Sequence, residues 1–196
     1  MSQFEFFMTF YGLLLGLGVA ELLSGFANIL RAPVRPKLGL LTPILAGQYL
    51  IQIMTTFFDA FVKLQNVGAD FAGFALPTVI GMAFFAGAVM VVPRRAEDWA
   101  SLDAYFFHQR RWTVGATLLA FFATVLIELP SVWGFVAAGD WSRFTFYAVM
   151  NGVLLVSLIV PLFARSRFVI AGSLIFTAVF LVYLYSPIAF RPFAAG

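Results

Sequence analysis

The 196-residue sequence contains no cysteine, a single histidine (His108) and few charged residues. Without cysteine the chain cannot form disulfides, thiolate metal sites or a cysteine nucleophile. One histidine excludes a bis-histidine haem pair and a histidine-rich metal cluster. Charged residues make up 11% of the chain, compared with roughly 25% in soluble domains. These deficits argue against a soluble protein and against most metal-dependent chemistry.

Several sequence motifs of known chemistry are also missing. The chain has no phosphate-binding GxxxxGK sequence, no TVGYG-like carbonyl filter and no HExxH zinc motif. Both lysines, Lys37 and Lys63, lie outside the middle of the apolar segments, so no retinal Schiff base is expected. Ser24 has no histidine within reach, which argues against serine-type acyl transfer. We therefore expect a non-enzymatic protein with no catalytic residue and no metal, and the sequence indicates no cofactor.

Apolar residues dominate the chain. They make up 62% of it, the mean hydropathy is +0.97, and 25 residues are phenylalanine. A compact water-soluble core could not bury so many phenylalanine rings, whereas lipid tails accept them on every outward face. The 12 lysine and arginine residues are dispersed over short links, so no nucleic-acid partner is expected. The lipid bilayer is the expected environment.

Six apolar segments are long enough to cross a hydrocarbon layer of ~30 Å as helices. They are residues 6–30, 40–62, 71–92, 113–136, 144–163 and 168–190. Between the third and fourth segments, Trp99, Leu102 and Phe106 fall at helical spacing, which predicts a short amphipathic surface helix over 96–111 that runs into the fourth span. The predicted fold is an all-α polytopic membrane protein, with residues 1–196 in a single domain.

The basic residues predict the orientation of this bundle. Nine of the 12 lie in the first, third and fifth links. Links rich in lysine and arginine stay in the cytoplasm, so both termini are expected on the periplasmic side of a bacterial inner membrane. The N-terminal MSQFEFF lacks the basic residues of a signal peptide, so we expect the first segment to be retained as a span. Four arginines of the third link are predicted to anchor this topology and to attract anionic lipid headgroups. They are Arg94, Arg95, Arg110 and Arg111.

Small or polar side chains recur at every fourth position of the first segment. This ridge consists of Gly12, Gly16, Ala20, Ser24 and Asn28. Such a ridge lets another helix approach closely, and we expect it to pack against a helix of the same chain or, alternatively, against another copy. Glu21 lies beside it, and a carboxyl group at membrane depth is costly unless it faces protein or water. We therefore expect the first helix inside the bundle, with Glu21 turned inward.

Five polar residues in the spans form the candidate site. They are Glu21, Gln48, Gln52, Glu128 and Asn151. Counting about 1.5 Å per residue from the cytoplasmic ends places Glu21 and Gln48 at similar depth, where they could pair. Gln52, Asn151 and Glu128 lie deeper and, with Thr55 and Thr56, extend a polar ladder that a proton or small cation could follow.

Structural roles are the alternative for the same residues. Buried amides often only fasten neighbouring helices together, and a protonated glutamate can do the same. Asp59 and Lys63 lie four residues apart near the outer end of the second span, which predicts an ion pair at the membrane interface. His108, beside Arg110 and Arg111, is expected in contact with solvent or headgroups.

Two resemblances accompany these patterns. The first segment contains FYGLLLGLGVAELLSGFANILRA, and the third link contains PRRAEDWASLDAYFFHQRRW. Together they resemble a group of uncharacterised bacterial inner-membrane proteins of alphaproteobacterial type, which implies six helices and no particular activity. The run from Gly18 to Glu21, Gly-Val-Ala-Glu, is similar to the first helix of small multidrug resistance antiporters. This second resemblance implies that Glu21 is a shared site for protons and cationic substrates.

The function class expected from the sequence is a structural or accessory subunit of a larger membrane complex, or a homo-oligomer. The reason is that almost nothing extends outside the predicted bilayer except a short surface helix. Two alternatives stay open. One is a proton-coupled small-molecule transporter or an ion channel that uses Glu21 and Glu128. The other is a protein that binds a hydrophobic ligand, such as a quinone, a pigment or a lipid, in a phenylalanine-lined groove.

Overall fold

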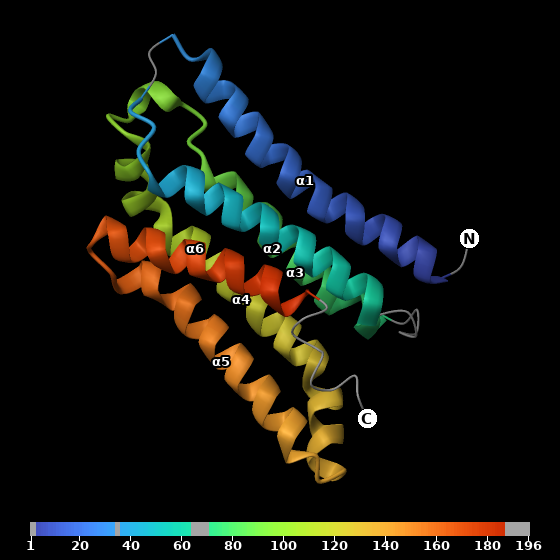
Figure 1. Ribbon diagram of the computed structural model, residues 1–196. Helices are drawn as coiled ribbons and strands as arrows, with labels where there is room; N and C mark the ends of the chain where they lie inside the picture. Colours follow the sequence, from blue (N-terminus) through green and yellow to red (C-terminus); the bar gives the residue numbers. More distant parts are fainter. Residues whose placement is uncertain (1–2, 34–35, 64–70, 187–196) are drawn as a thin grey trace.

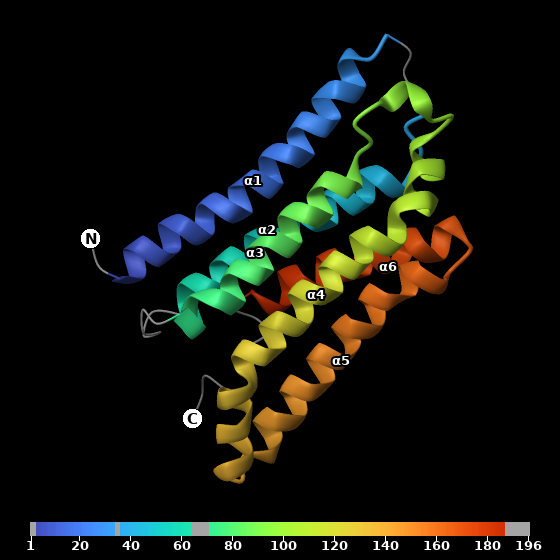
Figure 2. The ribbon, with the colours of Figure 1, turned by 180° about the vertical axis from the view of Figure 1, so that it is seen from behind.

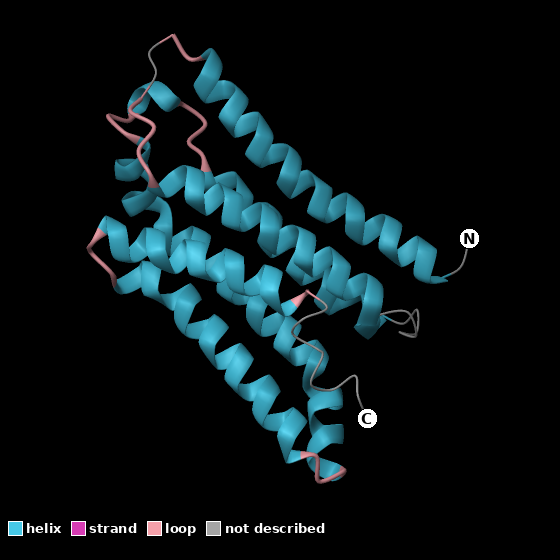
Figure 3. Cartoon of the chain, viewed as in Figure 1, coloured by secondary structure: helices cyan, strands magenta, loops and turns pink. Residues whose placement is uncertain are grey.

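The computed structural model describes residues 3–33, 36–63 and 71–186. Within these residues, six α-helices are long and apolar enough to cross a membrane, which is consistent with a multi-pass membrane protein. The helices are α1 (Gln3–Arg31), α2 (Leu41–Lys63), α3 (Phe71–Val91), α4 (Leu102–Ala137), α5 (Trp141–Phe163) and α6 (Arg167–Leu184) (Figure 1). Figure 3 shows these helices joined by loops. The six predicted spans are thus confirmed as helices, and the end of the sixth prediction, 187–190, lies outside the described residues.

The surface helix predicted over 96–111 is not present as a separate element, and only its part from Leu102 onward is α-helical and runs into the fourth span as expected. Ala96–Asp98 form a single 3-10 turn (η1), and α4 begins at Leu102 and continues without interruption to Ala137. The side chain of Ser101 accepts a hydrogen bond from the Ala104 amide and so begins the helix. No proline follows until Pro130, so hydrogen bonding propagates from the amphipathic segment into the span. Figure 2 shows that the first and last turns of α4 run in different directions from its central part.

The helices form an elongated bundle with α1 on one side and α5 on the other (Figures 1 and 2). α1 packs mainly on α3, α3 packs on α4, and α2 packs on α6. α4, α5 and α6 are joined by short links and pack as sequential neighbours. The start of α1 and the end of α6 lie at the same end of the bundle. We call this the terminal end, and the opposite end the basic end.

Large side chains determine which face of α1 packs against the rest of the bundle. Tyr11, Leu15 and Leu22 are at most 2% exposed, and a methyl group at Gly25 would lie 2.7 Å from Cβ of Val92. The predicted small-residue ridge is mostly exposed, at Gly16, Ala20, Ser24 and Asn28. Gly12 approaches Phe57 of α2, and Ser24 and Asn28 line a small cavity against α3, so the ridge meets the rest of the chain only in part. Positions four apart drift about 40° around a helix at each step, and large side chains make more van der Waals contacts than small ones when they pack against a neighbouring helix.

The first and third links meet at the basic end. The amide of Leu102 donates to the carbonyl of Lys37 at 2.9 Å. The amides of Leu40 and Leu41 both donate to Oδ1 of Asp103 at 2.9 Å, so one carboxylate from α4 caps the start of α2. These contacts hold α2 and α4 together where both begin.

Arg110 joins the fifth link to the same end. Its guanidinium donates to the carbonyl of Pro161 at 3.0 Å and to that of Ala164 at 2.6 Å. The last carbonyls of a helix have no partner within it and carry partial negative charge, so a guanidinium is well placed there. Arg110 therefore supplies hydrogen bonds to carbonyls at the end of α5. Only contact with lipid headgroups was predicted for this residue. Arg94, Arg95 and Arg111 are exposed, and their contact with lipid headgroups stays a prediction.

Candidate functional site

A cavity of about 690 Å³ lies between α2, α4, α5 and α6. Its lining extends from Arg143, Tyr185 and Ser186 at the terminal end down to Gln52 and Leu158. Gln52 precedes the last residue of α2 by about three turns, or ~16 Å. The cavity therefore reaches from the terminal end to about the middle of the bundle.

Most of the wall is aromatic or aliphatic. The phenylalanines that line the cavity are Phe58, Phe84, Phe121, Phe135 and Phe146. Leucine side chains of α5 and α6 complete the apolar surface. The rings of Phe58 and Tyr185 meet edge to face, with centroids 6.2 Å apart, and so join the wall of α2 to the end of α6.

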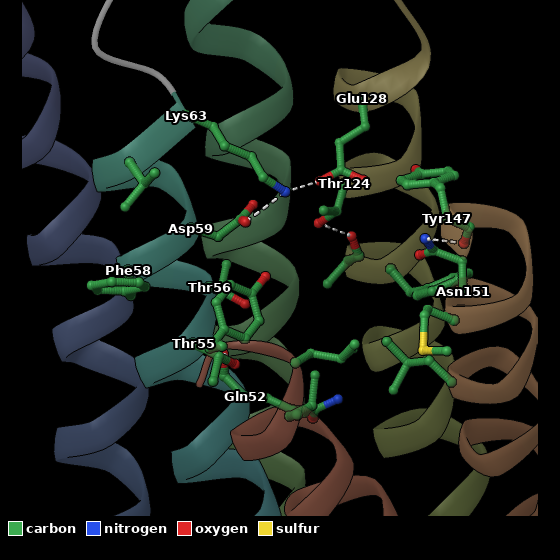
Figure 4. A pocket seen from close by; sticks show the side chains of 18 of the residues that line it. Gln52, Thr55, Thr56, Phe58, Asp59, Lys63, Thr124, Glu128, Tyr147 and Asn151 are labelled. Carbon is green, nitrogen blue, oxygen red and sulfur yellow. Dashed lines mark hydrogen bonds and ion pairs between the residues drawn. The ribbon is translucent and has the colours of Figure 1, made fainter. Parts of the chain in front are cut away.

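A cluster of three charges lies at the outer part of this cavity (Figure 4). The ammonium of Lys63 is 2.7 Å from Oδ1 of Asp59 and also donates a hydrogen bond to Oε1 of Glu128. The side chains of Asp59 and Glu128 are only 12% and 14% exposed, whereas that of Lys63 is 48% exposed. The predicted pair of Asp59 and Lys63 is confirmed. We call these three residues the ionic cluster.

Sequence reasoning missed the membership of Glu128 in this cluster. Glu128 and Lys63 are 65 residues apart in the chain, so no helical spacing connects them. The flexible side chain of a lysine can extend several ångströms along the protein. Its ammonium can therefore contact a residue whose depth along the bundle, counted in residues, differs from that of the lysine itself. The sequence did contain a signal for this contact, because Lys63 and Glu128 have opposite charges and lie near the same end of two predicted spans.

The deeper polar side chains present acceptors to the cavity. The hydroxyl of Thr55 donates to the carbonyl of Ile51 at 2.9 Å, and that of Thr124 donates to Ala120 at 3.0 Å. The amide nitrogen of Asn151 donates to the carbonyl of Tyr147 at 3.0 Å. Because these donors are used within their own helices, mainly lone pairs remain for a molecule in the cavity.

One polar atom of the wall has no hydrogen-bond partner among the described residues. It is Oε1 of Gln52, which is buried. Gln52 is 6% exposed as a whole residue and lies at the inner limit of the cavity (Figure 4). A buried polar group without a hydrogen bond is costly. This atom marks a place where a bound molecule or water would recover free energy.

Buried hydrogen bonds close the bundle beneath the cavity. The hydroxyl of Tyr49 donates to the carbonyl of Thr113 at 3.3 Å, and Thr117 donates to the Tyr49 hydroxyl at 3.1 Å. Between α5 and α6, Thr177 donates to the hydroxyl of Ser157 at 2.9 Å. Tyr49, Thr113 and Thr177 are at most 1% exposed. The cavity is thus separated from the basic end by tightly packed side chains.

The structure divides the predicted polar ladder. Gln52, Glu128 and Asn151 line the large cavity together. Glu21 instead lines a separate cavity of about 280 Å³ between α1 and the end of α3. Gln48 is buried but lines neither cavity, and no hydrogen bond between described residues joins it to Glu21. The expected pairing of these two residues is therefore wrong, because α1 packs on α3 and holds its acid away from the large cavity.

Within the described ranges, no group of three or more histidine, aspartate and glutamate side chains is arranged to hold a metal ion. The ionic cluster includes its own cation in Lys63, which occupies the place between the two carboxylates. No protein-family model, no curated protein and no solved structure matches the chain significantly.

Proposed function

We propose that this protein is a non-enzymatic multi-pass membrane protein that binds a small amphipathic molecule between α2, α4, α5 and α6. The observation that carries the proposal is the cavity of about 690 Å³ with its apolar wall and few polar groups. Pockets for small molecules are typically about 300–1,000 Å³ and have this composition. The size also exceeds what a bare ion or a few ordered waters would need.

A purely structural role accounts less well for this region. Helices that are only fastened together pack closely and leave few voids larger than a water molecule. Here Oε1 of Gln52 is buried without a hydrogen-bond partner among the described residues, beside an open volume. Binding of a molecule would both fill the volume and satisfy this atom. The ligand-binding alternative is therefore favoured over the structural subunit expected from the sequence.

The test is to fill the cavity from one helix and compare with a matched change outside it. Thr124→Phe adds a ring to the cavity wall, whereas Leu126→Phe changes a side chain of the same helix that is 52% exposed. Each protein is purified in nanodiscs, and co-purifying small molecules are identified by native mass spectrometry and solvent extraction. We expect a bound species in the wild type and in Leu126→Phe that Thr124→Phe loses. Identical profiles for all three proteins would refute the proposal.

The second proposal is a transporter, favoured by the one-sided access to the cavity. A site open toward one end and closed by the contacts of Tyr49 toward the other is the geometry of one state in alternating access. Glu128 lies in the cavity and Glu21 does not. In proteoliposomes with an imposed pH gradient, we therefore expect Glu128→Gln to abolish substrate-coupled proton flux and Glu21→Gln to leave it intact. The opposite result would return Glu21 to the central role implied by the antiporter resemblance.

We further propose that the protein lies in a bacterial inner membrane with both termini on the periplasmic side. The argument is the concentration of basic residues in the links at the basic end. In this orientation the cavity faces the periplasm, and its closed side faces the cytoplasm.

A further inference from the structure

We infer that the ligand of the large cavity is a small organic cation with a protonated amine and an apolar body. This inference rests on the proposed ligand-binding function and adds a charge selectivity to it. Three features of the cavity support it: the charge of the ionic cluster, the supply of hydrogen-bond acceptors, and the aromatic wall.

The ionic cluster carries more negative than positive charge. Asp59 and Glu128 contribute two carboxylates and Lys63 one ammonium. Both carboxylates are largely buried, at 12% and 14% exposure, while the lysine is the last residue of α2 and 48% exposed. A charge acts most strongly where little water screens it, so the buried carboxylates dominate the field inside the cavity.

The remaining cation of the lining does not offset this charge. Arg143 lies at the terminal end, and its side chain is 53% exposed. Its Nε atom is 3.3 Å from Oδ2 of Asp140, so it already has an anionic partner outside the cavity. An anionic ligand would therefore approach two buried carboxylates with only Lys63 to favour it. A cationic ligand meets the excess negative charge directly.

The neutral polar groups favour the same ligand. The hydroxyl hydrogen of Thr124 and one amide hydrogen of Asn151 are donated to carbonyls of their own helices, so the side-chain oxygens of both residues remain as acceptors in the cavity lining. Oε1 of Gln52 is a buried acceptor without a hydrogen bond among the described residues. A protonated amine supplies donors and no acceptor, so it complements this surface better than an alcohol or a carboxylate does.

The aromatic wall accommodates both parts of such a molecule. Rings of Phe121 and Phe146 line the cavity beside the polar residues (the cavity is shown in Figure 4). The faces of aromatic rings attract cations, and the same rings exclude water from an apolar body. A hydrated metal ion would gain little from these surfaces. The cavity thus fits an amine that carries a hydrocarbon group.

The inference is tested with three probes that share one hydrocarbon body. Phenylbutylamine is cationic at neutral pH, phenylbutanol is uncharged and phenylbutyrate is anionic. Binding of each radiolabelled probe to the full chain in phosphatidylcholine nanodiscs is measured by equilibrium dialysis, and partition into empty nanodiscs is subtracted. We expect the amine to bind about tenfold more tightly than the alcohol and the carboxylate to bind most weakly.

Two variants separate charge recognition from general damage. Glu128→Gln should reduce amine affinity by about tenfold and leave alcohol affinity unchanged. Asn151→Leu leaves the ionic cluster intact and should also weaken amine binding selectively. Glu97→Gln, at an exposed position in η1, is the control and should bind all three probes like the wild type.

The outcomes distinguish the two proposals. Equal binding of the three probes, lost in Thr124→Phe, would overturn the cation selectivity and leave the ligand-binding function in place. Stronger binding of the carboxylate would overturn the selectivity in the same way. If no probe exceeds its partition into empty nanodiscs, the cation inference fails, and the ligand-binding function then stands or falls on the co-purification experiment.

Discussion

Lys63, the last residue of α2, bridges Asp59 on its own helix and Glu128 on α4. This contact connects two helices across the outer part of the cavity, and one ammonium is the shared cationic partner of both carboxylates.

Replacing Lys63 with methionine should therefore destabilise the protein. The two carboxylates would lose their cationic partner at 12% and 14% exposure. Removing one member of such a group costs about 1–3 kcal/mol, reduced here because the lysine itself is half exposed. Thermal unfolding in detergent measures the effect, with Lys63→Arg as the charge-preserving control. An unchanged midpoint for Lys63→Met would show that the bridge contributes nothing to stability.

Gly87 should not tolerate a methyl group. A Cβ atom there would overlap the Tyr49 hydroxyl and lie 3.1 Å from Cβ of Ala116. The resulting shift would disturb the hydrogen bonds that close the cavity floor, at a cost of about 1–3 kcal/mol. Gly172→Ala is the matched control, because a methyl group at Gly172 meets no described atom within 4 Å. Equal unfolding midpoints for the two variants would contradict the packing described for Tyr49.

Asp103→Ala should loosen the start of α2. The carboxylate accepts hydrogen bonds from the amides of Leu40 and Leu41, which have no partner within their own helix. Loss of a cap of this kind costs about 0.5–2 kcal/mol. Hydrogen exchange at Leu40 and Leu41 should accelerate, while Asp98→Ala, at an exposed position, should leave it unaltered. Similar exchange in both variants would argue that the cap is dispensable.

Single cysteines can test the proposed orientation, because the native chain contains none. Ser142 lies at the terminal end and Ser166 at the basic end, and both are exposed. In bacteria with a permeabilised outer membrane, a membrane-impermeant maleimide should label Ser142→Cys. Ser166→Cys should react only after the inner membrane is opened. The reverse labelling pattern would invert the topology and place the cavity toward the cytoplasm.

The exposed ridge of α1 predicts a contact between copies of the chain, which is the alternative that the sequence left open. Gly16 and Ala20 are small and exposed, and such surfaces let helices approach closely in lipid. Ala20→Cys should therefore form a disulfide-linked dimer in oxidised membranes. Val179→Cys, at a position that is 63% exposed on α6, should not. Failure of Ala20→Cys to cross-link above Val179→Cys would remove the ridge as an interface.

Hydrophobic runs predicted the six helices well because crossing a bilayer requires about 20 apolar residues whatever their neighbours are. The surface helix predicted over 96–111 was correct only in part. Its residues after Ser101 are helical and run into the following span as predicted, but the helix begins at the Ser101 cap and not at residue 96. Local amphipathicity indicates a helix without showing where it begins.

The candidate site was predicted in part. Gln52, Glu128 and Asn151 were recognised as polar residues inside the spans, and the structure brings them to one cavity. Glu21 belongs to a different cavity because the face of α1 is chosen by its large residues, a choice that depends on the surface of α3. The rotation of a helix about its own axis decides which side chains face its neighbours, and this rotation is set by packing against them.

The amino-acid sequence alone determined that this chain forms helices long and apolar enough to cross a membrane, since the hydrophobic effect and backbone hydrogen bonding in lipid act on each segment separately. Tertiary structure decided which polar residues meet. Lys63 reaches Glu128 across 65 residues, and α2, α4, α5 and α6 enclose an open volume between them. Such contacts arise from the shapes of several helices together, and no single segment contains that information.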